Sequence, residues 1–123
     1  GKRILVADDN KMNRLVASAM LKNYGAEIIH AGNGEEALQK IKEELFDIVF
    51  MDVQMPVMDG IEATKIIRAD KSIIQPHIIA MTAGTSDEDI TECYRSGMND
   101  YLPKPYHIEV LLSKIQKIME SKT

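Results

Sequence analysis

The chain has 123 residues, with 45% hydrophobic and 28% charged residues and a formal net charge of −4, which is the composition of one folded domain. Its 15 basic residues are outnumbered by 19 acidic ones, so direct binding of nucleic acid through a basic face is not expected. Because the chain carries one cysteine, no signal peptide and no apolar run of membrane length, we expect a single domain over residues 1–123, cytoplasmic and without membrane contact.

Short apolar runs recur along the chain and predict strands. Three of them are continuously apolar, which is typical of strands that are covered on both faces, as in a parallel sheet. The runs occupy residues 4–7, 28–29, 48–51, 78–81 and 101–102.

The longer stretches between these runs carry apolar residues at helical spacing. They predict helices over residues 12–20, 37–45, 61–68, 90–98 and 108–119. The apolar stripe of the first helix is Met12, Leu15, Val16, Ala19 and Met20. Asn33 and Ser86 stand three residues before an acidic residue and predict N-terminal caps.

The order strand–helix, repeated five times, predicts an α/β fold. Right-handed crossovers limit the possible topologies, and the common solution for five strands is the flavodoxin-like order 2-1-3-4-5. We therefore expect a doubly wound five-stranded parallel sheet, (βα)5.

Polar side chains follow the predicted strands at their carboxyl ends, which all meet at one edge of a parallel sheet. They are Asp8, Asp9, Asp52, Thr82 and Lys104. Three carboxylates repel one another unless a cation lies among them, and oxygen ligands favour Mg²⁺. Acidic groups, Mg²⁺, a hydroxyl and an ammonium together are suited to a phosphoryl group, which a carboxylate can attack in line.

Four segments at these strand ends resemble the motifs of response-regulator receiver domains (CheY-like), the phosphoacceptor modules of two-component signalling. They are residues 4–10, 51–60, 80–83 and 100–105, and the resemblance extends over essentially the whole chain. Gln54, two residues after the acceptor position, is most similar to receivers of hybrid histidine kinases, and Asn10 and Asn13 fit the same subgroup.

The resemblance implies that Asp52 accepts a phosphoryl group. It implies that Asp8 and Asp9 hold Mg²⁺ together with Asp52 and the backbone carbonyl of Gln54. The donor would be the phosphohistidine of a histidine kinase or histidine phosphotransfer protein, and we expect it to dock near the first helix and the loop around Met55–Met58. The isolated domain would be no enzyme apart from promoting its own phosphorylation and dephosphorylation, and it would be a monomer or weak dimer.

The resemblance also implies a switch. Thr82 would hydrogen-bond the phosphoryl group, Lys104 would pair with it, and Tyr101 would change rotamer together with Thr82. A cis peptide bond is expected between Lys104 and Pro105. Gly84, two residues after Thr82, has no side chain to guide a water to the phosphoryl group.

Two other functions remain open from the residues alone. One is a phosphohydrolase with an aspartyl-phosphate intermediate. The other is a nucleotide-binding module, because residues 32–37 fit G-x-G-x-x-A and Asp52 follows 20 residues after the first glycine. Cys93 is expected to be a buried small residue, and Lys114 and Lys117 to form the solvated face of the last helix.

Overall fold

The structure, a computed structural model, describes residues 3–21, 25–83, 86–103 and 108–121. Within these residues strands and helices alternate as the sequence predicts. The elements are β1 (Arg3–Ala7), α1 (Lys11–Leu21), β2 (Glu27–Ala31), α2 (Gly34–Glu43), β3 (Ile48–Asp52), α3 (Gly60–Ala69), β4 (His77–Thr82), α4 (Asp87–Ser96), β5 (Asp100–Pro103) and α5 (Ile108–Ser121). None of the described helices is both long and apolar enough to cross a membrane.

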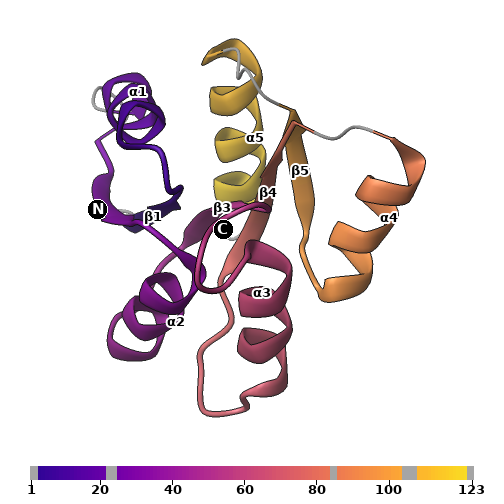
Figure 1. Cartoon of the computed structure of the whole chain (residues 1–123). Coiled ribbons are helices and arrows are strands. Elements are labelled where there is room, and N and C mark those ends of the chain that lie inside the picture. Colours follow the sequence, from indigo (N-terminus) through magenta and orange to yellow (C-terminus); the bar gives the residue numbers. More distant parts are fainter. Residues whose placement is uncertain (1–2, 22–24, 84–85, 104–107, 122–123) are drawn as a thin grey trace.

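The described strands form one parallel sheet in the order β2-β1-β3-β4-β5, which confirms the predicted topology (Figure 1). Val6 on β1 lies opposite His30 on one side and Phe50 on the other, so β1 is an inner strand. Because all these strands run in the same direction, the ends of β1, β3 and β4 lie side by side at one edge of the sheet.

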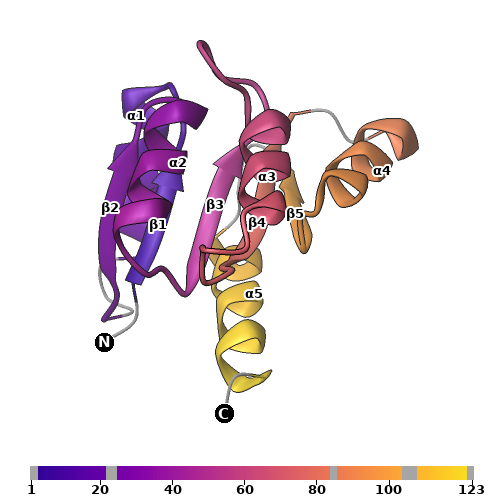
Figure 2. The same ribbon diagram turned by 90° about the horizontal axis from the view of Figure 1, so that it is seen from below.

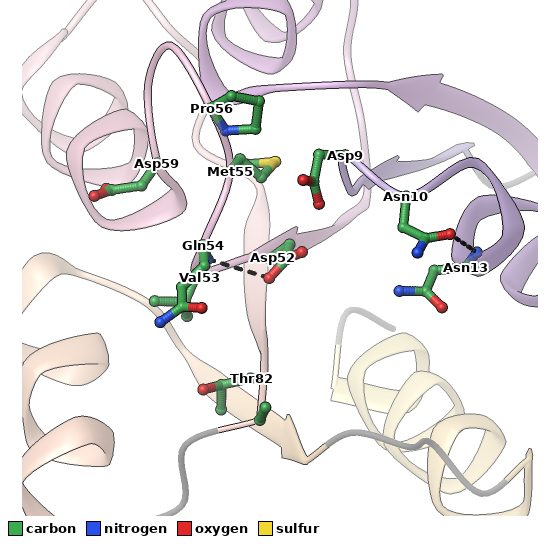
Figure 3. Close-up of a pocket in the computed structure, with 11 residues that line it drawn as sticks. Asp9, Asn10, Asn13, Asp52, Val53, Gln54, Met55, Pro56, Asp59 and Thr82 are labelled. Carbon is green, nitrogen blue, oxygen red and sulfur yellow. Dashed lines mark hydrogen bonds between the residues drawn. The ribbon is translucent and has the colours of Figure 1, made fainter.

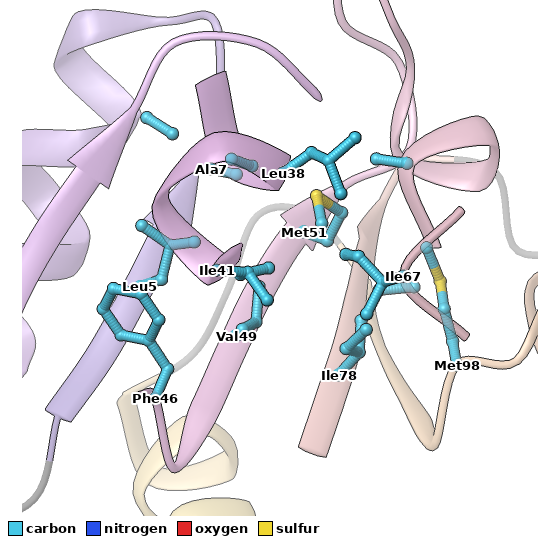
Figure 4. Packing of buried hydrophobic residues seen from close by; sticks show 14 of the residues in the cluster. Leu5, Ala7, Leu38, Ile41, Phe46, Val49, Met51, Ile67, Ile78 and Met98 are labelled. Atoms are coloured by element: carbon cyan, nitrogen blue, oxygen red, sulfur yellow. The ribbon is translucent and has the colours of Figure 1, made fainter. Parts of the chain in front are cut away.

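Helices cover both faces of this sheet (Figures 1 and 2). Alternate strand residues such as Leu5, Val49 and Ile78 pack with α2, α3 and α4. Figure 4 shows them beside Leu38 and Ile41 of α2 and Ile67 of α3. Their neighbours Ile4 and Phe50 pack with α1 and α5 on the other face. This alternation explains the continuously apolar strands, because each side chain of the central strands enters one of two cores.

The apolar stripe that predicted α1 does not face the core. Met12, Leu15 and Val16 are 66%, 53% and 39% exposed, and α1 instead contacts the sheet through Ala17 and Leu21. The sheet side of this helix also carries polar residues whose hydrogen bonds are satisfied within the fold, so apolar periodicity alone does not identify its buried face.

The helix starts agree better with the sequence. The Asn33 Oδ1 atom accepts a hydrogen bond of 2.8 Å from the backbone N–H of Glu36, and Ser86 caps α4 in the same way. The expectation for Leu45 is wrong, because α2 ends at Glu43 and Leu45 is 59% exposed.

Candidate functional site

The carboxyl ends of β1, β3 and β4 bring together four of the side chains that the sequence singled out, and Figure 3 shows three of them, Asp9, Asp52 and Thr82. Asp8, Asp52 and Thr82 are buried, whereas Asp9 is exposed. One carboxylate oxygen from each of the three aspartates lies within 4.8 Å of the others. Beside them opens a cavity of about 650 Å³, lined by Asp9, Asp52 and Thr82 among others. The predicted convergence of these residues is therefore seen in the structure.

Two of the carboxylates are oriented by backbone N–H groups two residues further along the chain. Asp8 Oδ1 accepts a hydrogen bond of 2.9 Å from the N–H of Asn10, and Asp52 Oδ1 accepts one of 3.2 Å from the N–H of Gln54. Such turns are favoured by aspartate, whose short side chain reaches its own backbone. They fix the direction of each carboxylate before any ligand arrives.

A close approach of α3 to β3 supports the loop over residues 53–59, which we call the acceptor loop after the role expected of Asp52. A Cβ atom on Gly60 would lie 2.2 Å from the carbonyl oxygen of Asp52, so only glycine fits there. The N–H of Gly60 donates to the carbonyl oxygen of Val53 at 3.0 Å. The loop that follows Asp52 is thereby tied back onto the end of β3.

The tip of the acceptor loop is a tight γ-turn. Val57 has φ of 67°, and the N–H of Met58 donates to the carbonyl oxygen of Pro56 at 2.7 Å. A positive φ is strained for a β-branched residue. Val57 is also 75% exposed, so the turn holds an apolar side chain in solvent next to the cavity.

The donor set fits a hard divalent cation. Asp8, Asp9 and Asp52 offer carboxylate oxygens only, and oxygen ligands in such number favour Mg²⁺ over zinc or copper. A cation among them relieves the mutual repulsion of three negative groups at a largely buried site. The chemistry of the cluster and the predicted Mg²⁺ are thus compatible.

Three residues of the predicted site, Lys104, Pro105 and Gly84, lie outside the described residues. This applies to the expected ammonium partner, to the expected cis peptide bond and to the position two residues after Thr82.

Tyr101 on β5 is half-buried and held between two helices. Its ring meets that of Tyr94 on α4 edge to face, with centroids 6.4 Å apart. Lys114 Nζ on α5 lies 5.9 Å from the Tyr101 ring centroid and 2.9 Å from Asp100 Oδ2. The expectation that Lys114 is only part of a solvated face is therefore wrong. The expectation for Cys93 is confirmed, because it is 2% exposed and burial raises the pKa of its thiol.

The cavity also contains residues to which the sequence assigned no chemical role. Asn13 on α1 lines it, as does Asp59, whose Oδ1 atom caps α3 by accepting from the N–H of Glu62 at 2.8 Å. Its place in the sequence could have indicated that Asn13 belongs to the site, because it lies in the first turn of the helix that follows the two predicted metal ligands.

The glycine motif at residues 32–37 does not form a phosphate cradle. The N–H of Gly34 donates to the carbonyl oxygen of Met58 at 2.8 Å, and that of Glu36 donates to Asn33. Asp52 lies on β3, which β1 separates from the edge strand β2 that precedes the motif. A nucleotide-binding function is therefore not favoured.

Comparison with known proteins gives a consistent result. The family model for the response regulator receiver domain matches residues 4–116. The chain is 46% identical over 109 residues to an osmosensing histidine protein kinase of Saccharomyces cerevisiae, covering 84% of this chain and 9% of that protein. Across eight curated histidine kinases the chain spans 6% to 16% of their length.

Two solved structures are informative neighbours. One is the receiver domain of a sensor histidine kinase of Pseudomonas aeruginosa with a magnesium ion in its active-site cleft, at 35% identity, a TM-score of 0.89 and 98% coverage of both chains. The other is a co-crystal of a Saccharomyces cerevisiae histidine phosphotransfer protein with the receiver domain of its downstream response regulator. It matches at 35% identity and a TM-score of 0.85, covering 93% of this chain and 86% of that one.

Proposed function

Because the chain belongs to the family of response regulator receiver domains, the phosphoacceptor modules of two-component signalling, we propose that Asp52 is its phosphoacceptor. The observation that carries the proposal is the convergence of Asp8, Asp9 and Asp52 at the end of three parallel strands. Asp52 is the one that enters the cavity from the central strand, with one oxygen oriented by the N–H of Gln54.

The reaction follows from these roles. A carboxylate oxygen of Asp52 attacks phosphorus, the P–N bond of the donor phosphohistidine breaks, and its electron pair stays on the imidazole nitrogen. The Thr82 hydroxyl would donate to a phosphoryl oxygen, and Lys104 is assigned as the paired cation. Asp8 and Asp9, with Asp52 and the carbonyl group of Gln54, would hold Mg²⁺. The ion, when bound, neutralises negative charge on the phosphoryl oxygens.

We assign the phosphohistidine partner to one face next to the cavity, made of Met12, Leu15 and Val16 on α1 and Val57 in the acceptor loop. All four apolar side chains are well exposed. An exposed apolar patch beside an active site is typical of a protein–protein interface. The neighbour that was crystallised with a histidine phosphotransfer protein supports a partner of this class.

We also propose that the domain belongs to a hybrid histidine kinase, since the eight curated relatives are histidine kinases and three of them are named as hybrid signal transduction histidine kinases. A phosphohydrolase is not favoured. The one further carboxylate among the described residues that line the cavity is Asp59, and it is engaged as the cap of α3. It is therefore poorly suited to protonating a leaving group.

Incubation with acetyl phosphate and Mg²⁺, followed by mass spectrometry, tests the assignment. Wild-type protein should gain one phosphoryl group, and Asp52→Asn should gain none, because the amide has lost the nucleophilic oxygen. Removal of Mg²⁺ with EDTA should give the same loss. Asp87→Asn, which changes an exposed aspartate on α4, serves as the matched control and should be labelled normally. Full labelling of Asp52→Asn would refute the assignment.

A further inference from the structure

The side-chain amide of Asn13 has no hydrogen-bond partner among the described residues. Asn13 lies in the first turn of α1, where its backbone N–H donates to Asn10 Oδ1 at 3.2 Å. Its side chain is half-buried and lines the cavity beside Asp52, yet among the described residues it makes no hydrogen bond. Figure 3 shows this side chain on the α1 side of the cavity, reaching toward the open space near Asp52 and Thr82.

The rest of the helix explains why this amide is placed there. Asn10 Oδ1 also accepts from the N–H of Met12 at 2.8 Å, so the first turn of α1 is fixed by its cap. The exposed apolar residues Met12 and Leu15 lie on the partner face, whereas Asn13 lines the cavity. A polar group held at a cavity wall without a protein partner is available to a ligand.

We propose that Asn13 is a further residue of the phosphoryl site, whose Nδ2–H donates to an oxygen of the phosphoryl group on its way to Asp52 and after its arrival. This inference rests on the proposed function. The transferring group carries negative charge on three oxygens, and the hydroxyl of Thr82 approaches from β4. Asn13 supplies a donor from the α1 wall. It stays neutral and exchanges no proton, so only a hydrogen bond is added while the P–N bond breaks and the P–O bond forms.

A neutral amide suits this task better than a charged side chain. It can donate to an anion without weakening the binding of a cation at Asp8 and Asp9. A carboxylate at the same position would have no N–H to donate and would repel the phosphoryl group. Asn13→Asp is therefore the most informative substitution. It keeps the shape of the side chain but replaces a hydrogen-bond donor with a negative charge that repels the phosphoryl group.

The experiment measures the affinity of beryllofluoride, a phosphoryl analogue, and the rate of labelling by acetyl phosphate, which needs no partner surface. Asn13→Ala should lower both roughly tenfold, the value of one hydrogen bond to a charged group. Asn13→Asp should lower them further, while Mg²⁺ affinity is unchanged or tighter. Asn13→Gln, which keeps a donor, should recover part of the loss. Melting temperatures should match wild type, because the Asn13 side chain makes no hydrogen bond to the described residues.

Gln39→Glu is the matched control, since it makes the same change of charge on an exposed position of α2. It should bind beryllofluoride like wild type. Equal affinities and rates for wild type, Asn13→Ala and Asn13→Asp would overturn the role of Asn13 and leave Asp52 as the acceptor. Wild-type protein that takes neither label nor beryllofluoride would instead overturn the proposed function. A melting temperature of Asn13→Ala below that of wild type would assign the residue a role in folding. The exception is an Asn13→Gln protein that melts like wild type and is still labelled by acetyl phosphate more slowly than wild type.

Discussion

His30, on the edge strand β2, has one ring nitrogen in a hydrogen bond and the other buried. Its Nε2 atom lies 2.8 Å from Ser18 Oγ on α1, and Nδ1 has no hydrogen-bond partner among the described residues. Burial, together with the nearby positive charge of Arg14, lowers the pKa of His30 below its usual 6.5. Protonation would place a hydrogen on a buried nitrogen that lacks an acceptor, so the folded state favours neutral imidazole.

A pH dependence of stability follows. Since the pKa of His30 is lower in the folded than in the unfolded chain, the unfolded chain binds more protons as pH falls below about 6.5. The free energy of unfolding should therefore decrease as pH falls from 7.5 to 5.5. Urea denaturation of wild type and His30→Gln measures this, and the variant should lose less stability over that range. An equal loss in both proteins would show that other groups cause the decrease.

At the scale of elements, α1 shows where reading the sequence fails. Two helical stripes coexist on it, and the more apolar one faces solvent. The other stripe contains Ala17 and Leu21 together with Arg14 and Ser18. Arg14 Nη1 donates to the carbonyl oxygen of Asp8 at 2.6 Å, and Ser18 contacts His30. Periodicity cannot reveal that polar residues find partners on the sheet side, so the choice between the two faces requires the tertiary structure.

The exposed stripe of α1 leads to a prediction about the partner. Leu15→Lys should leave folding intact, because Leu15 is more than half exposed and surface substitutions change stability by about 0.5 kcal/mol or less. It should weaken binding of a phosphohistidine partner about tenfold or more, since a charge replaces an apolar contact. Titration calorimetry with the partner measures the affinity. Ile74→Lys changes an equally apolar residue, 73% exposed and close to the amino end of β4, and is the control. Normal affinity of Leu15→Lys would exclude α1 as the docking face.

For the molecule as a whole, the topology was the most predictable feature and the source of the site prediction. Alternating runs predicted a parallel sheet, and the sheet order then placed Asp8, Asp52 and Thr82 at one edge. The contacts that remained unpredicted depend on the angles at which helices pack. Lys114 on α5 reaches Asp100 on β5, and Asn13 turns into the cavity, because of how α5 and α1 lie on the sheet. No spacing in the sequence encodes these angles.

The arrangement around Tyr101 connects the acceptor site with a distant surface. The Tyr101 ring lies against Tyr94 of α4 and close to Lys114 of α5, and β5 pairs with β4, which ends at Thr82. We propose that a phosphoryl group on Asp52 draws Thr82 toward it, and that the ring of Tyr101 turns into the space that Thr82 leaves. The ring would then leave its contacts with both helices. Such a change is a shift between two states, one of which contacts the phosphoryl group better.

We therefore predict that beryllofluoride changes amide chemical shifts in α4, β5 and α5 as well as in the acceptor loop. Tyr101→Ala should keep the changes in the acceptor loop and lose most of those in α4, because the ring that joins the two regions is gone. Asp52→Asn, which cannot form the adduct, should show neither set and serves as the control. Changes confined to residues 53–59 in wild-type protein, with Tyr94 and Tyr101 unmoved, would mean that the signal leaves the domain through another face. Any change in the turn at residues 32–37 should be limited to Gly34, whose N–H donates to the carbonyl oxygen of Met58 in the acceptor loop.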